Sequence, residues 1–174
     1  ESLSSAKKRG AKIIAEMIGY GSSSDAFRVT DMHEEGRGAI QAMTAALTDA
    51  GIGYKDVDYI STHGTSTGEN DAIETKAIKA VFKEKAKSTP ASSVKSMLGH
   101  LIGAAGAAEL ITCVLAIRDG IVPPTINLND PDPALDLDYV PNKARKMPVN
   151  VAMNESFGFG GQNDVVIVKK WAGD

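Results

Sequence analysis

The sequence predicts an α/β fold: a mixed, mainly parallel sheet of five strands, with helices on both faces and one helix buried. Stretches with the apolar density of strands alternate along the chain with stretches whose apolar residues recur at helical spacing. Such alternation is typical of strands joined by crossover helices, which makes neighbouring strands parallel. In addition, residues 104–117 are apolar all round except at Glu109 and Thr112, as expected of a helix packed between two layers.

The expected elements follow one another in a simple order. They are a strand at 11–20, a helix at 38–50, a strand at 57–60, a helix at 71–83, a strand at 91–96, the buried helix from His100 to Ile117, and strands at 149–153 and 165–169. Ile40, Met43 and Leu47 recur at helical spacing in the first helix, which Gly51 then ends.

The bulk properties restrict the class of protein. A chain of 174 residues suits one domain, and a net charge of -3 provides no electrostatic footprint for nucleic acid. No apolar run has the length of a membrane span, no signal peptide opens the chain, and a single cysteine suits a reducing compartment. We therefore expect a cytoplasmic protein without a metal site, and the start at Glu1 suggests part of something longer.

Three features follow predicted strands directly: His63, His100 and the glycine-rich loop 157–161. In open α/β sheets, ligands bind beyond the carboxyl ends of the strands. Two neutral imidazole N–H groups aimed at one point would stabilise an enolate or a thioester oxyanion. The alternative is that His100 only caps a turn at the start of a packed helix.

Charged residues near the histidines are candidates for support. A buried carboxylate needs a partner, so Glu109 is expected to pair with Lys95, directly or through His100, unless the two form a surface salt bridge. Asp71 is either a carboxylate at a helix N-terminus or an orienting group for His63, and its spacing favours the former.

Other candidates have structural alternatives. Thr65 and Thr67 could hydrogen-bond an amide-rich ligand or cap turns, and Phe159 could gate a channel or fill the core. His33 lies in a charged loop and is expected to be exposed, whereas Cys113 lies deep in the apolar helix, where a thiol is structural. The chain thus has donors for an oxyanion but no evident nucleophile, and it lacks a G-x-S-x-G elbow.

Four motifs carry a resemblance to a known family. They are T-H-G-T-S-T (62–67), S-V-K-S-M-L-G-H-L-I-G-A-A-G-A-A-E (93–109), P-P-T-I-N-L (123–128) and E-S-F-G-F-G-G-Q-N (155–163). Together they resemble the β-ketoacyl-acyl carrier protein synthases, in particular the elongating synthase II type. The resemblance implies that 1–174 is a C-terminal thiolase-like domain, and that the N-terminal half with the nucleophilic cysteine is absent.

The resemblance also implies roles. His63 and His100 would bind the malonyl thioester carbonyl and promote decarboxylation, with Lys95 and Glu109 as a supporting charged pair. Asp71 matches a carboxylate near the first histidine.

Further implied roles concern the substrate arm and the acyl pocket. Thr65 and Thr67 would hydrogen-bond phosphopantetheine, and Phe159 would be the gate. The sequence departs from the family pattern at 68–70 and at Glu155, where asparagine is usual, which puts a cation site or loop hydrogen bond there in doubt.

The implied activity is that of an acyltransferase in fatty acid biosynthesis: decarboxylative Claisen condensation of malonyl-acyl carrier protein (malonyl-ACP) with an acyl-enzyme. No cofactor is implied, because ACP carries the substrates on phosphopantetheine. The implied partners are ACP, the missing half and, in the complete enzyme, a second copy. We expect the fragment alone to be inactive, with an exposed apolar face. A polyketide ketosynthase domain and a non-catalytic partner or scaffold fragment are the alternatives.

Overall fold

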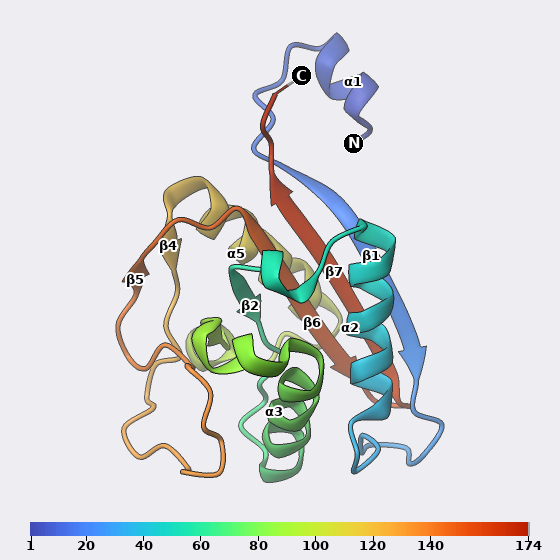
Figure 1. The fold of residues 1–174 in the computed structure, drawn as a ribbon, viewed down its shortest axis with the longest axis vertical. Helices are drawn as coiled ribbons and strands as arrows, with labels where there is room; N and C mark the ends of the chain where they lie inside the picture. The colour runs from blue at the N-terminus through green and yellow to red at the C-terminus, as the bar shows by residue number, and fades with distance from the viewer. Residues whose placement is uncertain (174) are drawn as a thin grey trace.

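The structure, a computed structural model that describes residues 1–173, is built on a five-stranded sheet in the order β1-β7-β6-β2-β3 (Figure 1). These strands are β1 (Ala15–Ser24), β2 (Tyr59–Ser61), β3 (Ala91–Ser92), β6 (Val151–Gly158) and β7 (Gln162–Lys170). The short strands β4 (Ile121–Val122) and β5 (Arg145–Lys146) form a separate antiparallel pair. The expected α/β class and five-stranded sheet are confirmed.

The sheet is mixed but not mainly parallel, which corrects that part of the prediction. β2 pairs in parallel with both β3 and β6, whereas β7 pairs antiparallel with both β6 and β1. The difference arises because β6 and β7 form a hairpin, with no crossover helix between them.

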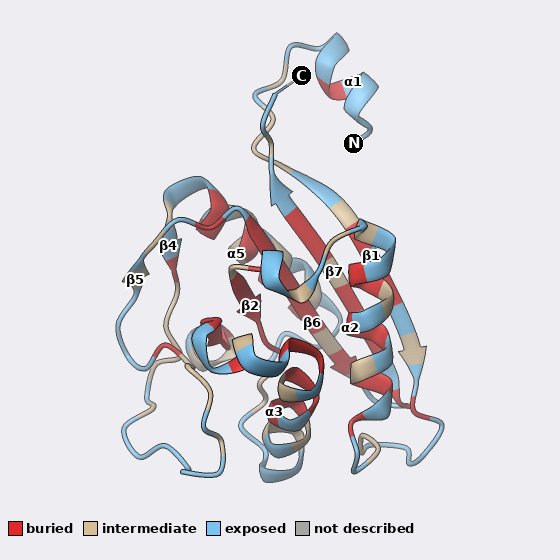
Figure 2. Ribbon diagram, in the orientation of Figure 1, coloured by how far each residue is buried: buried red, intermediate tan, exposed pale blue. Residues whose placement is uncertain are grey.

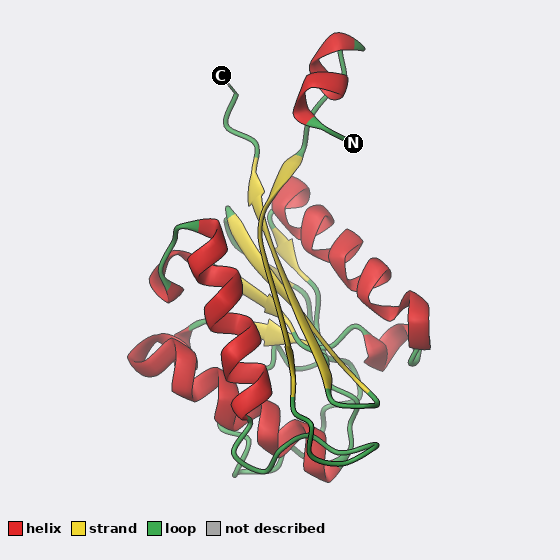
Figure 3. Ribbon diagram, turned by 90° about the vertical axis from the view of Figure 1, so that its right-hand side faces the viewer, coloured by secondary structure: helices red, strands yellow, loops and turns green. Residues whose placement is uncertain are grey.

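Helices cover both faces of the sheet, as the edge-on view shows (Figure 3). The α-helices are α1 (Leu3–Lys8), α2 (Arg37–Ala50), α3 (Gly68–Phe82), α4 (Lys95–Leu98) and α5 (Ala105–Asp119), and 3-10 turns occupy Tyr54–Asp56, Lys83–Ser88 and Ile102–Ala104. α2 and α3 pack on one face and α5 on the other. Within residues 1–173, no helix has both the length and the apolar character that a bilayer crossing requires.

Each face of the sheet has its own hydrophobic core. Much of β2, β6 and β7 is buried (Figure 2). Neighbouring strand residues point to opposite faces, so Ile60 joins Met43 and Phe82 beneath α2 and α3. Tyr59 instead packs with Cys113 of α5. The burial of both faces explains why these strands are apolar without alternation.

α5 differs from the expected buried helix in two respects. Only one side of it packs on the sheet, and the other side leaves Ile111 59% exposed. The helix also begins at Ala105, so His100 lies in the loop before it. Gly99 takes a left-handed conformation (φ 75°) that ends α4, and Lys95 begins α4 instead of lying on an extended strand.

The backbone of β1 lies very close to the backbone of α2. A Cβ atom at Gly21 would lie 2.1 Å from the carbonyl oxygen of Ala42 and 2.5 Å from the amide nitrogen of Ala46. We expect Gly21→Ala to lower the free energy of unfolding by about 1–3 kcal/mol, measured by urea denaturation. Gly68→Ala is the matched control, because a Cβ there meets nothing within 4 Å. Equal stability of the two variants would contradict this packing.

Candidate active site

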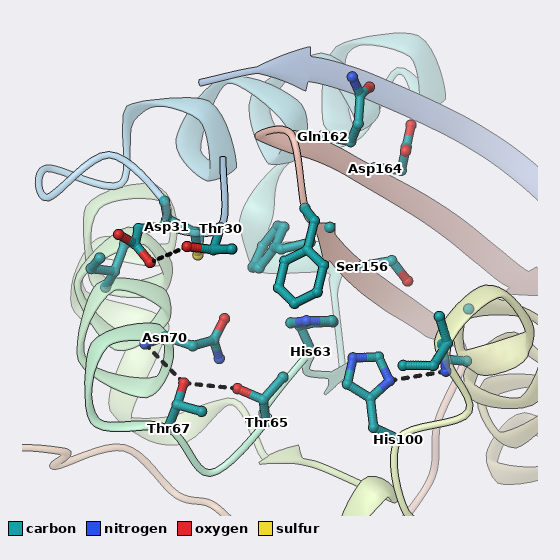
Figure 4. A pocket seen from close by; sticks show the side chains of 18 of the residues that line it. Thr30, Asp31, His63, Thr65, Thr67, Asn70, His100, Ser156, Gln162 and Asp164 are labelled. Carbon is teal, nitrogen blue, oxygen red and sulfur yellow. Dashed lines mark hydrogen bonds between the residues drawn. The ribbon is translucent and has the colours of Figure 1, made fainter. Parts of the chain in front are cut away.

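A cavity of about 720 Å³ opens where β2 and β6 end (Figure 4). Its lining includes His63, His100, Thr65, Thr67, Phe157 and Phe159. His63, His100 and the glycine-rich loop, which were predicted to share one edge of the sheet, therefore border the same space. His100 does so from the loop after α4, because β3 ends at Ser92, and not directly after a strand as predicted.

The two histidines lie against one another at the floor of this cavity. Their ring centroids are 5.4 Å apart, and the ring planes meet at 81°. His63 follows β2 and is buried, whereas His100 reaches the cavity from the exposed loop after α4.

Hydrogen bonds determine which nitrogen of each ring is free. The Nζ of Lys95 lies 3.3 Å from Nδ1 of His63, and the backbone N–H of Ile102 donates to Nδ1 of His100 at 3.1 Å. Because an ammonium and an amide N–H can only donate, each Nδ1 is an acceptor. In the neutral ring the proton then resides on Nε2, so each histidine has an Nε2–H group with which to meet a ligand.

Both rings are held neutral. Burial, assisted by the charge of Lys95 and the neighbouring His100, lowers the pKa of His63 to about 3. Partial burial and Lys95 also lower the pKa of His100. At neutral pH the pair therefore consists of two uncharged donors.

Lys95 and Glu109 form a buried ion pair, with side chains only 6% and 2% exposed. Burial raises the pKa of the Glu109 carboxyl, and the charge of Lys95 opposes that rise. The ammonium group thus contacts a carboxylate on one side and His63 on the other, which links α5 to the histidine on the opposite wall of the cavity.

The hydroxyl-rich loop after His63 caps α3. Thr67 is the N-cap residue, accepting from the amide of Asn70 at 3.4 Å, and the Oγ1 atoms of Thr65 and Thr67 are 3.0 Å apart. Asp71 lies in the first turn and accepts from the amide of Ser66 at 3.2 Å. Asp71 therefore stabilises the helix start, while both threonines also line the cavity.

Two phenylalanines of the last hairpin border the cavity in different ways. Phe159 lies at the turn between β6 and β7 and is 78% exposed. Phe157, which the sequence analysis did not single out, is buried with its ring 5.7 Å from that of His63. The sequence did contain a signal for Phe157. Side chains alternate between the two faces of a strand, so Phe157 lies on the same face of β6 as Glu155.

The remaining candidates lie outside the cavity lining. Cys113 is fully buried, as expected, and burial raises the pKa of its thiol to about 12, which leaves it unreactive. His33 is half-buried, not exposed as predicted, because its ring packs 5.0 Å from that of Phe27.

Comparisons with known proteins show which family the chain resembles. Residues 14–129 match the family described as "Beta-ketoacyl synthase, C-terminal domain". A 3-oxoacyl-[acyl-carrier-protein] synthase 2 from Staphylococcus aureus is 52% identical over 171 residues, which are 98% of this chain and 41% of the relative. The chain therefore spans about two fifths of the length of that relative.

Solved structures share the fold. The ishigamide ketosynthase/chain length factor has a TM-score of 0.94 and 44% identity, covering 99% of this chain and 42% of its own. A type II PKS acyl-carrier protein in complex with its ketosynthase has a TM-score of 0.94 and 43% identity, covering 97% and 41%. With the domain match and the shared thiolase-like fold, the chain belongs to the β-ketoacyl synthase family, as its C-terminal domain.

Proposed function

We propose that this chain is the C-terminal half of a 3-oxoacyl-ACP synthase and supplies the site that decarboxylates malonyl-ACP. The observation that carries the proposal is the pair of neutral histidines whose Nε2–H groups face one cavity. Donors fixed before reaction and aimed at a developing oxyanion provide the largest single contribution in many enzymes.

In the proposed reaction, the thioester carbonyl oxygen of the malonyl group accepts hydrogen bonds from His63 and His100. Carbon dioxide leaves, and the electron pair of the broken C–C bond moves onto the α-carbon and into the carbonyl as an enolate. That carbanion then attacks the acyl thioester on the cysteine of the N-terminal half, forming a C–C bond and releasing the cysteine thiolate. Neutral imidazoles suit the first step, because the oxyanion needs hydrogen-bond donors and no proton has to be removed.

The same cavity fits the substrate arm. Thr65 and Thr67 border it with free hydroxyl capacity, and we assign them to the amides of phosphopantetheine. The exposed Phe159 at the hairpin turn is assigned to the gate of the acyl pocket. ACP is the proposed partner, and no further cofactor is required for this chemistry. The structure of a type II PKS acyl-carrier protein with its ketosynthase supports that kind of partner.

Fatty acid elongation in the cytoplasm is favoured over polyketide synthesis. Identity is 52% to the synthase 2 relative but 44% and 43% to the two ketosynthase structures. A non-catalytic partner subunit is disfavoured, because such a partner would not need His63, Lys95 and His100 in this arrangement.

The outer side of α5 is the proposed contact with the N-terminal half. Large apolar side chains are exposed together there and on the preceding turns: Leu98, Leu101, Ile102, Ile111 and Leu115. An exposed patch of this kind marks a protein interface. With the N-terminal half on this patch, α5 would lie between two layers. The complete enzyme is then expected to form a dimer.

The proposal predicts a difference between this half and the complete gene product. Purified residues 1–174 are expected to form no 3-oxoacyl product from malonyl-ACP and acyl-ACP, because they lack a reactive cysteine. The complete product is expected to form it, detected by mass spectrometry of ACP. Turnover by 1–174 alone would show that the nucleophile is misassigned, and failure of the complete product would contradict the synthase assignment.

A further inference from the structure

Glu155 occupies an unusual position for a carboxyl group. It lies in the middle of β6 and is completely buried. Among residues 1–173, no group donates a hydrogen bond to either of its oxygens. The carboxyl group of Glu74, which projects from α3, lies close enough to act on its charge.

The partners of Glu74 identify it as the ionised member of this pair. Its Oε1 accepts from the backbone N–H of His63 at 2.7 Å, and its Oε2 accepts from the N–H of Gly64 at 2.9 Å. The Nδ2 of Asn70 is a third donor, 3.2 Å from Oε2. Glu155 has no such donor among the described residues, and an ionised carboxylate that is buried without a donor or a cation is costly. Three donors stabilise the charge of Glu74, so the proton belongs on Glu155.

The surroundings favour the same assignment. The titratable groups that face the pair in the described part of the chain are Asp71 of α3, Tyr139 of the loop before β5, Glu109 of α5 and the neutral His63. None of them brings a positive charge. Burial raises the pKa of both carboxyl groups. The amides of Gly64 and His63 oppose that rise for Glu74, whereas the neighbouring Glu74 adds to it for Glu155, whose pKa lies well above its usual value.

We propose that Glu155 is a positioning residue for His63: it remains a neutral acid beside Glu74, so that Glu74 keeps the single charge that fixes the loop beginning with His63. Loss of the proton of Glu155 would leave two buried carboxylates as neighbours. Their repulsion is relieved most directly when Glu74 moves away from the amides of His63 and Gly64, which releases the histidine loop. The activity of the site is therefore expected to fall at high pH, and an amide side chain at position 155 is expected to abolish this fall.

The proton itself is tested without reference to activity. Infrared spectra of the complete protein at pH 7 are compared between wild type and Glu155→Gln. A carbonyl stretching band of a protonated carboxyl group is expected in wild type and is expected to be lost in the variant. Glu16→Gln, which replaces an exposed strand glutamate, serves as the control and is expected to retain the band. Absence of the band in wild type would overturn the assignment.

The positioning role, which rests on the proposed function, is tested by the pH profile of malonyl-ACP decarboxylation. Above the pKa of Glu155, the wild-type rate is expected to fall about tenfold per pH unit, as for loss of one essential proton. Glu155→Gln and a second neutral variant, Glu155→Asn, are expected to lack this fall and to retain activity at pH 7.

If the rate of decarboxylation by the variants fell at high pH as much as the wild-type rate, the positioning role would be overturned. No decarboxylation by wild type would contradict the proposed function instead, and the infrared band would still decide where the proton resides.

Discussion

His100→Ala is expected to lower the rate of malonyl-ACP decarboxylation by the complete synthase about 10²–10³-fold, because it removes one of two preorganised N–H donors. The loss of rate should be large because the amide N–H of Ile102 donates to Nδ1 of His100, which leaves the Nε2–H group to face the cavity. Release of labelled carbon dioxide from malonyl-ACP measures this step. Transfer of the acyl group to the enzyme precedes it and should remain close to the wild-type rate.

His33→Ala is the control for the loss of an imidazole. His33 packs against Phe27 and lies outside the residues that line the cavity, so its removal should leave decarboxylation nearly unchanged. Decarboxylation by His100→Ala at the wild-type rate would refute the assignment of this ring as an oxyanion donor.

Lys95→Met is expected to lower the free energy of unfolding by about 3–5 kcal/mol, because it leaves the carboxylate of Glu109 buried without its cation. Both partners are almost fully buried, so water cannot replace the lost ammonium group. The variant also removes one of the charges that lower the pKa of His63. Chemical denaturation followed by circular dichroism measures the loss of stability.

A double-mutant cycle tests whether the ion pair is the cause. Adding Glu109→Gln to Lys95→Met removes the unpaired charge and should restore much of the stability. Lys55→Met is the surface control, because its pair with Glu84 is largely exposed and is expected to contribute little to stability. Equal losses in the buried and the exposed variant would contradict this account.

Much of the fold could be predicted because it depends on local patterns. The strands around Ile60 and Val165 and the helix that carries Met43 are visible in runs of apolar residues bounded by glycine. Strand direction could not be read in this way, because a hairpin and a crossover begin with similar strands. The apolar surface of α5 was correctly recognised, but in the described part of the chain only its inner side is covered.

The sequence predicted that several candidate residues lie close together. His63 and His100 were placed at one edge of the sheet, and the burial of Glu109 implied a partner, which is Lys95. The exact start of α5 was misplaced, since Gly99 and the left-handed Ile102 delay it in a way that apolar spacing does not reveal.

The contacts that hold His63 in place were harder to foresee. Glu74 lies on the buried side of α3 and Glu155 in the middle of β6, and only the folded structure brings these two acids together beneath the histidine loop. An isolated glutamate within an apolar strand was the one available signal. Its partner could not be inferred, because pairing between distant segments is set by packing and not by local sequence.

The most direct measurement is nitrogen-15 NMR of the imidazole rings in the complete protein, with histidine variants used for assignment. We predict that His63 and His100 are both neutral at pH 7 with the proton on Nε2. His63 should stay neutral as the pH falls to about 5, because its pKa is lowered to about 3. A charged ring at pH 7, or a proton on Nδ1 of either histidine, would contradict the claim that the two rings offer paired donors to one oxyanion.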